Sequence, residues 1–478
     1  MSENKRRPVS SGARLMTNTA VFAAGKLLSK LLVFCMTWLY TSCLTRSEFS
    51  TADLIANMAN LLIPLACVGI SEGIFRSAAA KTGDKEAFFT NGLVVLGGGS
   101  LTFLALSPLM GLIPFFDGSV WLIATYVLSA NLHSVVSQYL CAIGRTRLFA
   151  GQGILNTALV IAFNILFLPI LDLGVTGYVL STVLADLTTT IFLILITRLW
   201  RAVKPRSISW LTIRTMLRFC LPLVPTTIFW WITGVSDRYM VAALSSPEIN
   251  GLYTAAYKIP TLLIHAVSIF DSAWKLSVSA EEDPEACRAF YSRVWRVYTT
   301  LAFLGGGALM LTCRLFSSLL FAEGFRDAWV YVPILTYATV FTALDTFLGS
   351  VYFTSKKTVG SMLTAFAGAG LNVALNFLLI PPFGAMGASV ATFVSYFAVC
   401  VLRLISTHRL IPFSRELSRG ALNTLLLGGM TVAVTLTGTY SPALTWGSAG
   451  ILFAVLLACN ARALSELARD ALHMLRGK

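Results

Sequence analysis

Long apolar runs recur along the whole length of this 478-residue chain. A helix needs about 20 predominantly apolar residues to cross the hydrocarbon core of a bilayer, which is roughly 30 Å thick. The chain is 56% hydrophobic and 12% charged, whereas about a quarter of the residues of a soluble domain are charged. Because the hydrocarbon core contains no water, every backbone polar group there must be hydrogen-bonded within the protein. The sequence therefore predicts an all-α polytopic membrane protein.

The spacing of the apolar runs predicts about fourteen transmembrane helices. The first run follows a basic start but is too long for a signal peptide, so we interpret it as a retained helix. The predicted helices span residues 17–44, 51–76, 87–110, 118–143, 149–170, 175–200, 217–244, 250–277, 291–313, 329–354, 358–381, 385–407, 418–439 and 444–462.

Lysine and arginine placement predicts the orientation of these helices. With the N-terminus in the cytoplasm, most of the 36 Lys and Arg residues lie in segments that face inward. Outward loops hold only Arg46, Arg314 and Arg326. Cytoplasmic loops of membrane proteins carry this excess of positive charge, so we expect both termini in the cytoplasm. The net charge of +14 follows this loop pattern, and we expect no nucleic-acid partner.

Two internal matches indicate a repeat. Residues 43–62 align without a gap onto 243–262, with identities at Leu44/Leu244, Glu48/Glu248, Ala56/Ala256 and Leu62/Leu262. The segment Asn164–Pro169 also matches Asn376–Pro381, and each is followed by a G-x-x-G sequence. Six-helix copies that begin and end on one side share a topology and are related by an axis along the membrane normal.

The repeat predicts four parts of the chain. Residues 1–203 form an N-terminal lobe of six helices, and 204–218 form an amphipathic interfacial helix. Residues 219–410 form a C-terminal lobe of six helices, and 411–478 hold two further helices and a cytoplasmic amphipathic tail.

Ionisable residues inside apolar helices are the candidate functional residues, because charges in hydrocarbon are costly and usually line a polar interior. The basic ones cluster on the opening helices of the two halves and predict a cleft that attracts an anion such as phosphate. Lysines near helix ends could instead reach the headgroups, and Arg76 could pair with Glu72, four residues before it. These candidates are Lys26, Lys30, Arg76, Arg238 and Lys258.

Three acidic residues are candidates for ion coupling: Asp186, Asp345 and Asp271. Each could carry a proton or sodium ion, or could equally be the partner of an interior cation. Lone histidines such as His133 are more often packing residues than proton carriers. No nucleotide-binding loop, G-x-S-x-G motif or metal spacing occurs, and the nine cysteines include no C-x-x-C. We therefore expect no enzyme activity, no cofactor and no metal site.

The sequences LPLVP, SDRYMV and GLYTAAYKIP within 221–260, the two G-x-x-G helix openings and the six-plus-six-plus-two plan resemble the Wzx-like oligosaccharide flippases. These belong to the MOP (multidrug, oligosaccharidyl-lipid, polysaccharide) superfamily, which includes the MATE transporters. The resemblance implies a multi-pass transporter of the bacterial cytoplasmic membrane with two lobes. It would flip an undecaprenyl-pyrophosphate-linked oligosaccharide from the inner to the outer leaflet by alternating access, coupled to H⁺ or Na⁺.

The resemblance also implies that basic residues bind the pyrophosphate, and that membrane lipids, polysaccharide polymerase or glycosyltransferases are partners. Two alternatives stay open. One is another superfamily member, a lipid II flippase or a cation-coupled multidrug antiporter, although a basic interior argues against the antiporter. The other is a membrane-embedded sugar transferase, which the absence of a catalytic loop disfavours.

Overall fold

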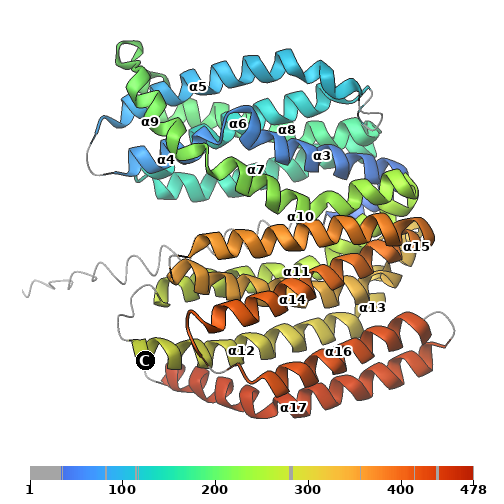
Figure 1. Cartoon of the computed structure of the whole chain (residues 1–478). Coiled ribbons are helices and arrows are strands. Elements are labelled where there is room, and N and C mark those ends of the chain that lie inside the picture. Colours follow the sequence, from blue (N-terminus) through green and yellow to red (C-terminus); the bar gives the residue numbers. More distant parts are fainter. Residues whose placement is uncertain are drawn as a thin grey trace, which may run out of the picture. The chain divides into compact units, whose positions relative to one another are not determined.

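The computed structural model describes residues 34, 36–80, 83–112, 116, 118–278, 284–355, 357–413, 415–437 and 441–476. Helices dominate these residues, and no strand occurs among them (Figure 1). Eleven helices of the described part are long and apolar enough to span a membrane. The prediction of an all-α, multi-pass membrane protein is confirmed. The predicted number of fourteen crossings stays a prediction.

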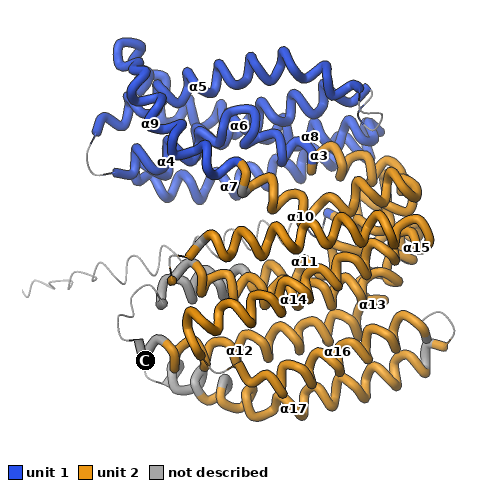
Figure 2. The backbone as a smooth tube through the Cα atoms, viewed as in Figure 1, with its two compact units in different colours: residues 1–36, 58–224 blue, residues 37–57, 225–478 orange. Residues whose placement is uncertain are grey.

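The chain divides into two compact units that do not follow the order of the sequence (Figure 2). Unit 1 comprises residues 1–36 and 58–224, and unit 2 comprises 37–57 and 225–478. Helix α3 (Arg46–Ala66) therefore starts in unit 2 and ends in unit 1. The predicted division into four segments of continuous sequence stays a prediction.

Unit 1 is built from helices that pack around a core containing Ile74, Leu96, Val136, Leu193 and Met216. Its elements after α3 are α4 (Ile70–Ala79), α5 (Lys85–Leu106), η1 (Ser107–Leu112), α6 (Val120–Ala142), α7 (Thr146–Ile165), η3 (Leu166–Ile170), α8 (Gly174–Thr197), η4 (Leu199–Ala202), η5 (Pro205–Ser207) and α9 (Trp210–Cys220).

Helix α9 forms within the predicted amphipathic segment, and one face of it is buried. Ile213, Met216 and Cys220 are buried, whereas Trp210 is exposed. The helix packs on α4 and α5, so its apolar side helps to complete the core of unit 1.

Unit 2 has a core rich in aromatic rings, with Tyr291, Trp295 and Tyr298 of one helix packed near Phe347. Its elements besides the start of α3 are α2 (Thr37–Cys43), α10 (Leu223–Leu244), α11 (Pro247–Val278), α12 (Pro284–Leu311), α13 (Cys313–Leu320), η6 (Glu323–Val330), α14 (Val332–Thr354), α15 (Thr358–His408), α16 (Leu417–Thr437) and α17 (Pro442–Arg476).

The two G-x-x-G sequences have matching geometry, which supports the internal repeat. Gly174 and Gly384 have φ angles of 51° and 57°, and a positive φ angle favours glycine. The second glycine of each sequence touches the preceding helix: a Cβ would lie 3.1 Å from the Phe167 carbonyl oxygen at Gly177 and 2.1 Å from that of Leu379 at Gly387. Gly384 divides α15 into two helices.

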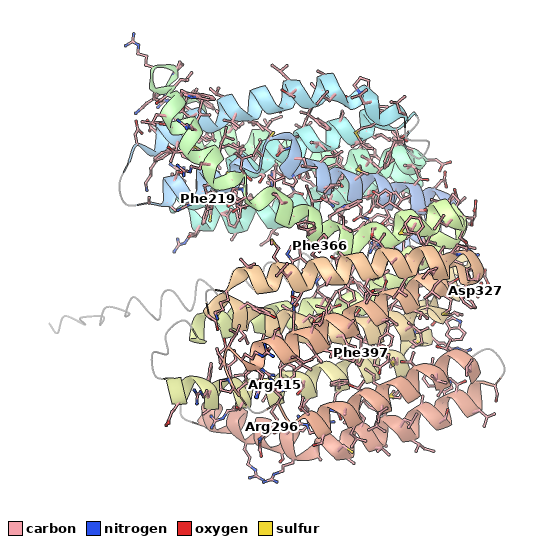
Figure 3. The ribbon with its side chains drawn as sticks, viewed as in Figure 1. Phe219, Arg296, Asp327, Phe366, Phe397 and Arg415 are labelled. Atoms are coloured by element: carbon pink, nitrogen blue, oxygen red, sulfur yellow. The ribbon has the colours of Figure 1, made fainter. Side chains whose placement is uncertain are left out.

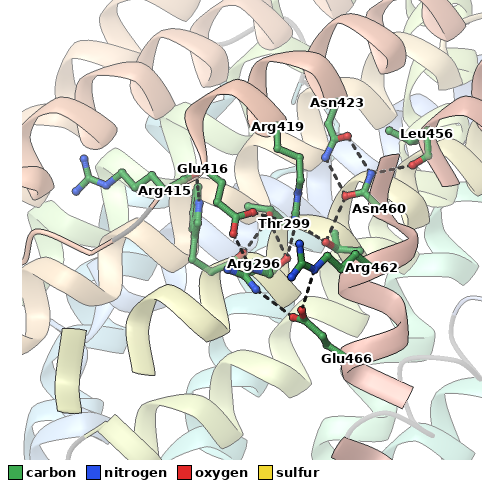
Figure 4. A network of polar contacts seen from close by, with 12 residues as sticks. Arg296, Thr299, Arg415, Glu416, Arg419, Asn423, Leu456, Asn460, Arg462 and Glu466 are labelled. Atoms are coloured by element: carbon green, nitrogen blue, oxygen red, sulfur yellow. Dashed lines mark hydrogen bonds and ion pairs between the residues drawn. The ribbon is translucent and has the colours of Figure 1, made fainter. Parts of the chain in front are cut away.

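A polar network joins α12, α16 and α17 at one end of unit 2 (Figure 4). The Arg296 guanidinium bonds Glu416 at 2.5 Å and Glu466 at 3.0 Å. Arg419 bonds Glu416 at 2.8 Å. Arg296 and Arg415 lie at this end, and Asp327 lies at the opposite end of the unit (Figure 3). The network fastens the last two long helices to the rest of unit 2.

Candidate functional site

Three charged side chains meet inside unit 2, where α3, α10 and α11 pack together. Arg238 Nη1 donates a hydrogen bond to Asp53 Oδ2 at 2.7 Å. Lys258 Nζ lies 3.8 Å from Asp53 Oδ1. The side chains of Asp53, Arg238 and Lys258 are 8%, 13% and 29% exposed. Two cations therefore share one carboxylate in a largely buried place, with Lys258 as the most accessible member. We call these three residues the charged triad.

Helix packing around the triad holds α3 against its neighbours. Tyr239 Oη donates to the main-chain oxygen of Leu54 at 2.6 Å, and Trp231 Nε1 donates to that of Asn57 at 2.8 Å. These bonds come from α10, the helix that also carries Arg238. They fix the turn of α3 that presents Asp53, because buried backbone oxygens need hydrogen-bond donors.

A second carboxylate, Asp237, lies beside the triad but is held by other groups. Its Oδ2 accepts hydrogen bonds from Tyr253 Oη at 2.7 Å and Tyr257 Oη at 2.9 Å, and a longer one from Thr392 Oγ1 at 3.4 Å. The Arg238 backbone N–H donates to Asp237 Oδ1 at 2.9 Å. Asp237 is therefore hydrogen-bonded by neutral donors, whereas Asp53 is the carboxylate in direct contact with both cations.

The structure brings together only part of the predicted basic set. Arg238 and Lys258 share Asp53, while Arg76 belongs to unit 1, where its guanidinium lies over the Phe219 ring with 4.1 Å to the centroid. Phe219 is one of the residues labelled in Figure 3. Lys26 and Lys30 lie outside the described residues. Their predicted role stays a prediction.

Asp186 of unit 1 sits in a polar cluster between α6, α7 and α8. Asn156 Nδ2 donates to its carboxylate at 2.7 Å, and Thr190 Oγ1 donates to its main-chain oxygen at 2.6 Å. The same Thr190 hydroxyl lies 3.2 Å from His133 Nδ1. A histidine and a buried carboxylate thus belong to one polar cluster that Thr190 connects.

Asp345 of unit 2 is buried, with only 6% of the residue exposed. Neither of its carboxylate oxygens has a hydrogen-bond partner among the described residues. Arg403 Nη1 instead donates to the main-chain oxygen of Asp345 at 2.7 Å. The sequence pattern placed Arg403 in an inward-facing segment, whereas the structure buries it beside Asp345. For Asp271, the backbone lies in α11 and the side chain is outside the described part.

Sequence reasoning missed Asp53. The signal was present, since this aspartate lies within an apolar helix and within the repeated segment 43–62. Its role became visible only through Arg238, which lies 185 positions later. In the described residues, no group of three or more His, Cys, Asp or Glu side chains could hold a metal ion.

Solved structures of similar fold cover nearly the whole chain. A lipid II flippase MurJ in an inward closed conformation matches 95% of this chain and 100% of its own, with a TM-score of 0.68 and 13% identity. An inward-facing multidrug resistance MATE transporter of the MOP superfamily matches 81% of this chain and 96% of its own, with a TM-score of 0.66 and 15% identity.

A third similar structure is a MOP superfamily transporter from Pyrococcus furiosus, described as having a binding pocket of reverse polarity. It matches 84% of this chain and 95% of its own, with a TM-score of 0.58 and 14% identity. At these identities the likeness establishes the fold, which is that of MOP superfamily transporters. No curated protein sequence matches the chain.

The sequence profile of one protein family matches residues 15–274, more than half of the chain. The matched region includes all three residues of the charged triad. This match identifies the chain as a member of the polysaccharide biosynthesis protein family, and its fold is the one that MOP superfamily transporters share.

Proposed function

We propose that the protein is a flippase that moves an undecaprenyl-pyrophosphate-linked oligosaccharide from the inner to the outer leaflet of the bacterial cytoplasmic membrane. It works by alternating access with both termini in the cytoplasm, and it serves polysaccharide biosynthesis. The observation that carries this proposal is the charged triad, in which Arg238 and Lys258 share one carboxylate. A guanidinium and an ammonium are the groups that proteins use to bind phosphate.

The family and the fold support the same function. The family description concerns polysaccharide biosynthesis, and one solved protein of the same fold is named as a flippase of lipid II. In this proposal Lys26, Lys30 and Arg76 contribute further positive charge to the pyrophosphate site. The other partners are membrane lipids and the polymerase or glycosyltransferases that handle the same glycan.

The energy for transport comes from a proton or sodium gradient in this proposal. Asp186, Asp345 and Asp271 are the candidate coupling residues. Asp345 is the strongest of these, because its buried carboxylate oxygens have no hydrogen-bond partner in the described structure. A buried carboxylate in that state favours binding of a proton or a cation.

A second candidate function is that of another MOP superfamily transporter. A lipid II flippase would use the same cations, since its substrate also carries a pyrophosphate. A cation-coupled multidrug antiporter is favoured only by the carboxylates Asp53 and Asp237, and these are already engaged by cations and tyrosines.

Leaflet-resolved accumulation of lipid-linked oligosaccharide in cells tests the proposal. We expect deletion of the gene to trap the intermediate in the inner leaflet, and Lys258→Gln or Arg238→Gln to do the same at normal expression. Arg462→Gln is the matched control, because that side chain is 94% exposed. An unchanged lipid distribution after deletion would refute the flippase function, and an export assay for small cations would then test the antiporter.

A further inference from the structure

The charged triad contains more hydrogen-bond donors than its carboxylate can accept. A guanidinium has five N–H donors and an ammonium has three. Within the described residues, Arg238 Nε is buried without a hydrogen-bond partner. Lys258 Nζ lies 3.8 Å from Asp53 Oδ1, which is an ion-pair separation and longer than a hydrogen bond. One short bond, from Arg238 Nη1, joins the cations to Asp53.

The remaining acceptor capacity of Asp53 is partly used by its own helix. Asn57 Nδ2 donates to Asp53 Oδ2 at 2.8 Å and to the Asp53 main-chain oxygen at 2.8 Å. The carboxylate therefore keeps a neutral donor on α3 that does not depend on Arg238 or Lys258. It can lose its contact with the cations without becoming unpaired.

The second carboxylate near Arg238, that of Asp237, already accepts hydrogen bonds from other donors. Asp237 is held by Tyr253 and Tyr257. Aromatic rings face the cations on another side, with the Arg238 guanidinium 4.9 Å from the Tyr257 centroid and Lys258 Nζ 5.9 Å from that of Phe49. A phosphate group, with several charged oxygens, would match the unused donors of both cations better than one carboxylate does.

We propose that Asp53 is a resident counter-ion that the phosphate of the substrate displaces from Arg238 and Lys258, and that returns when the substrate leaves. This inference rests on the proposed function and describes how its site is regulated. Without Asp53, Arg238 and Lys258 would lose the anion in direct contact with them and carry a larger desolvation penalty. Asp53 lowers that penalty in the empty protein. The free energy of phosphate binding is then the difference between the free energies of two ion-pair arrangements. This keeps binding weak enough for release on the other side of the membrane.

Binding of inorganic pyrophosphate to the purified full-length protein in nanodiscs of zwitterionic lipid, measured by calorimetry, tests this exchange. We expect Asp53→Asn to bind pyrophosphate about tenfold more tightly than the wild type, which corresponds to about 1.4 kcal/mol. Asp53→Glu keeps the competitor and should bind like the wild type. The double variant Asp53→Asn/Lys258→Gln should lose the gain.

The matched control is Asp327→Asn, which removes a carboxylate that is 77% exposed and paired with Arg46. It should leave pyrophosphate affinity unchanged. Thermal unfolding of each variant shows whether it is folded. If folded Asp53→Asn binds no more tightly than the wild type, Asp53 is not a competitor and the inference is overturned.

Two further outcomes separate this inference from the proposed function. If neither wild type nor Asp53→Asn binds pyrophosphate while the leaflet assay reports flipping, the inference fails and the flippase function stands. If Asp53→Asn gains affinity while gene deletion leaves lipid-linked oligosaccharide unchanged, the exchange site stands and the flippase function fails.

Discussion

Asn250 Nδ2 donates a hydrogen bond of 2.8 Å to Ser50 Oγ, and the two residues are 200 positions apart. They occupy the same position in the two copies of the repeated segment. The starts of α3 and α11 therefore pack against each other within unit 2. Asp53 of the charged triad lies about one helical turn after Ser50 on α3.

Close packing of these two helix starts requires glycine at position 251. A Cβ at Gly251 would lie 2.1 Å from the Arg46 carbonyl oxygen, which is backbone and cannot move aside easily. We expect Gly251→Ala to lower the free energy of unfolding by about 1–3 kcal/mol through overpacking. Thermal unfolding of the purified protein measures this change.

Gly234 of α10 is the matched control for that substitution. A Cβ there would meet no atom within 4 Å, and alanine favours a helix over glycine by up to about 1 kcal/mol. Gly234→Ala should leave the protein as stable as the wild type or slightly more stable. Equal stability of Gly251→Ala and Gly234→Ala would show that the two helices do not pack as closely as described.

Asn91 fastens the 202–209 linker to α5 in unit 1. Its Nδ2 donates to the Ser207 main-chain oxygen at 3.0 Å, and its Oδ1 accepts from the Ser209 N–H at 2.8 Å. Asn91→Ala leaves two backbone groups unpaired, so we expect a loss of about 1–3 kcal/mol in the free energy of unfolding. Asn60→Ala, at an exposed position of α3, should change stability by less than about 0.5 kcal/mol. Similar losses in both variants would contradict the role of Asn91.

Arg403 lies beside the buried Asp345 and donates a hydrogen bond of 2.7 Å to its main-chain oxygen. Arg403→Met should lower the free energy of unfolding by about 1–3 kcal/mol, because it removes the donor of a buried main-chain oxygen and leaves the Asp345 carboxyl group without a nearby cation. The double variant Asp345→Asn/Arg403→Met should recover part of that loss. A double-mutant cycle by thermal unfolding measures the coupling, and purely additive effects would rule it out.

Lys204 predicts a pH dependence at the surface of unit 1. Its hydrogen bond to Glu86, at 2.5 Å, and the neighbouring Asp84 raise the pKa of the Lys204 ammonium above its ordinary 10.5. A raised pKa in the folded state means that this contribution to stability is present below pH 10.5 and is lost as pH rises through the folded-state value.

The stability difference between wild type and Lys204→Met should therefore favour the wild type at neutral pH and fall toward zero at higher pH. Thermal unfolding of both proteins over this pH range measures it, and subtraction removes the titration of the other lysines. We expect a small effect, because the pair is solvent-exposed. A difference that does not change with pH would contradict the assignment.

The sequence alone determined the class of fold and the repeat. Hydrocarbon permits only fully hydrogen-bonded segments, so long apolar runs can form little other than membrane helices. The G-x-x-G sequences also determined the local backbone, because the positive φ angle at Gly174 and Gly384 is one that glycine adopts without steric cost. Lys258 and Arg238 were identified as candidates because charges inside apolar helices are costly wherever they lie.

Only the tertiary structure decided which charges meet. Asp53 contacts Arg238, which lies 185 positions later in the chain, and Lys258 on the following helix. No local sequence pattern encodes these contacts. The burial of Arg403 beside Asp345 and the assignment of residues 37–57 to unit 2 also depend on packing between segments far apart in the chain. The sequence around a charged residue in a helix does not reveal whether its neighbour in space is lipid, a tyrosine or a carboxylate. That neighbour decides what the charged side chain can bind.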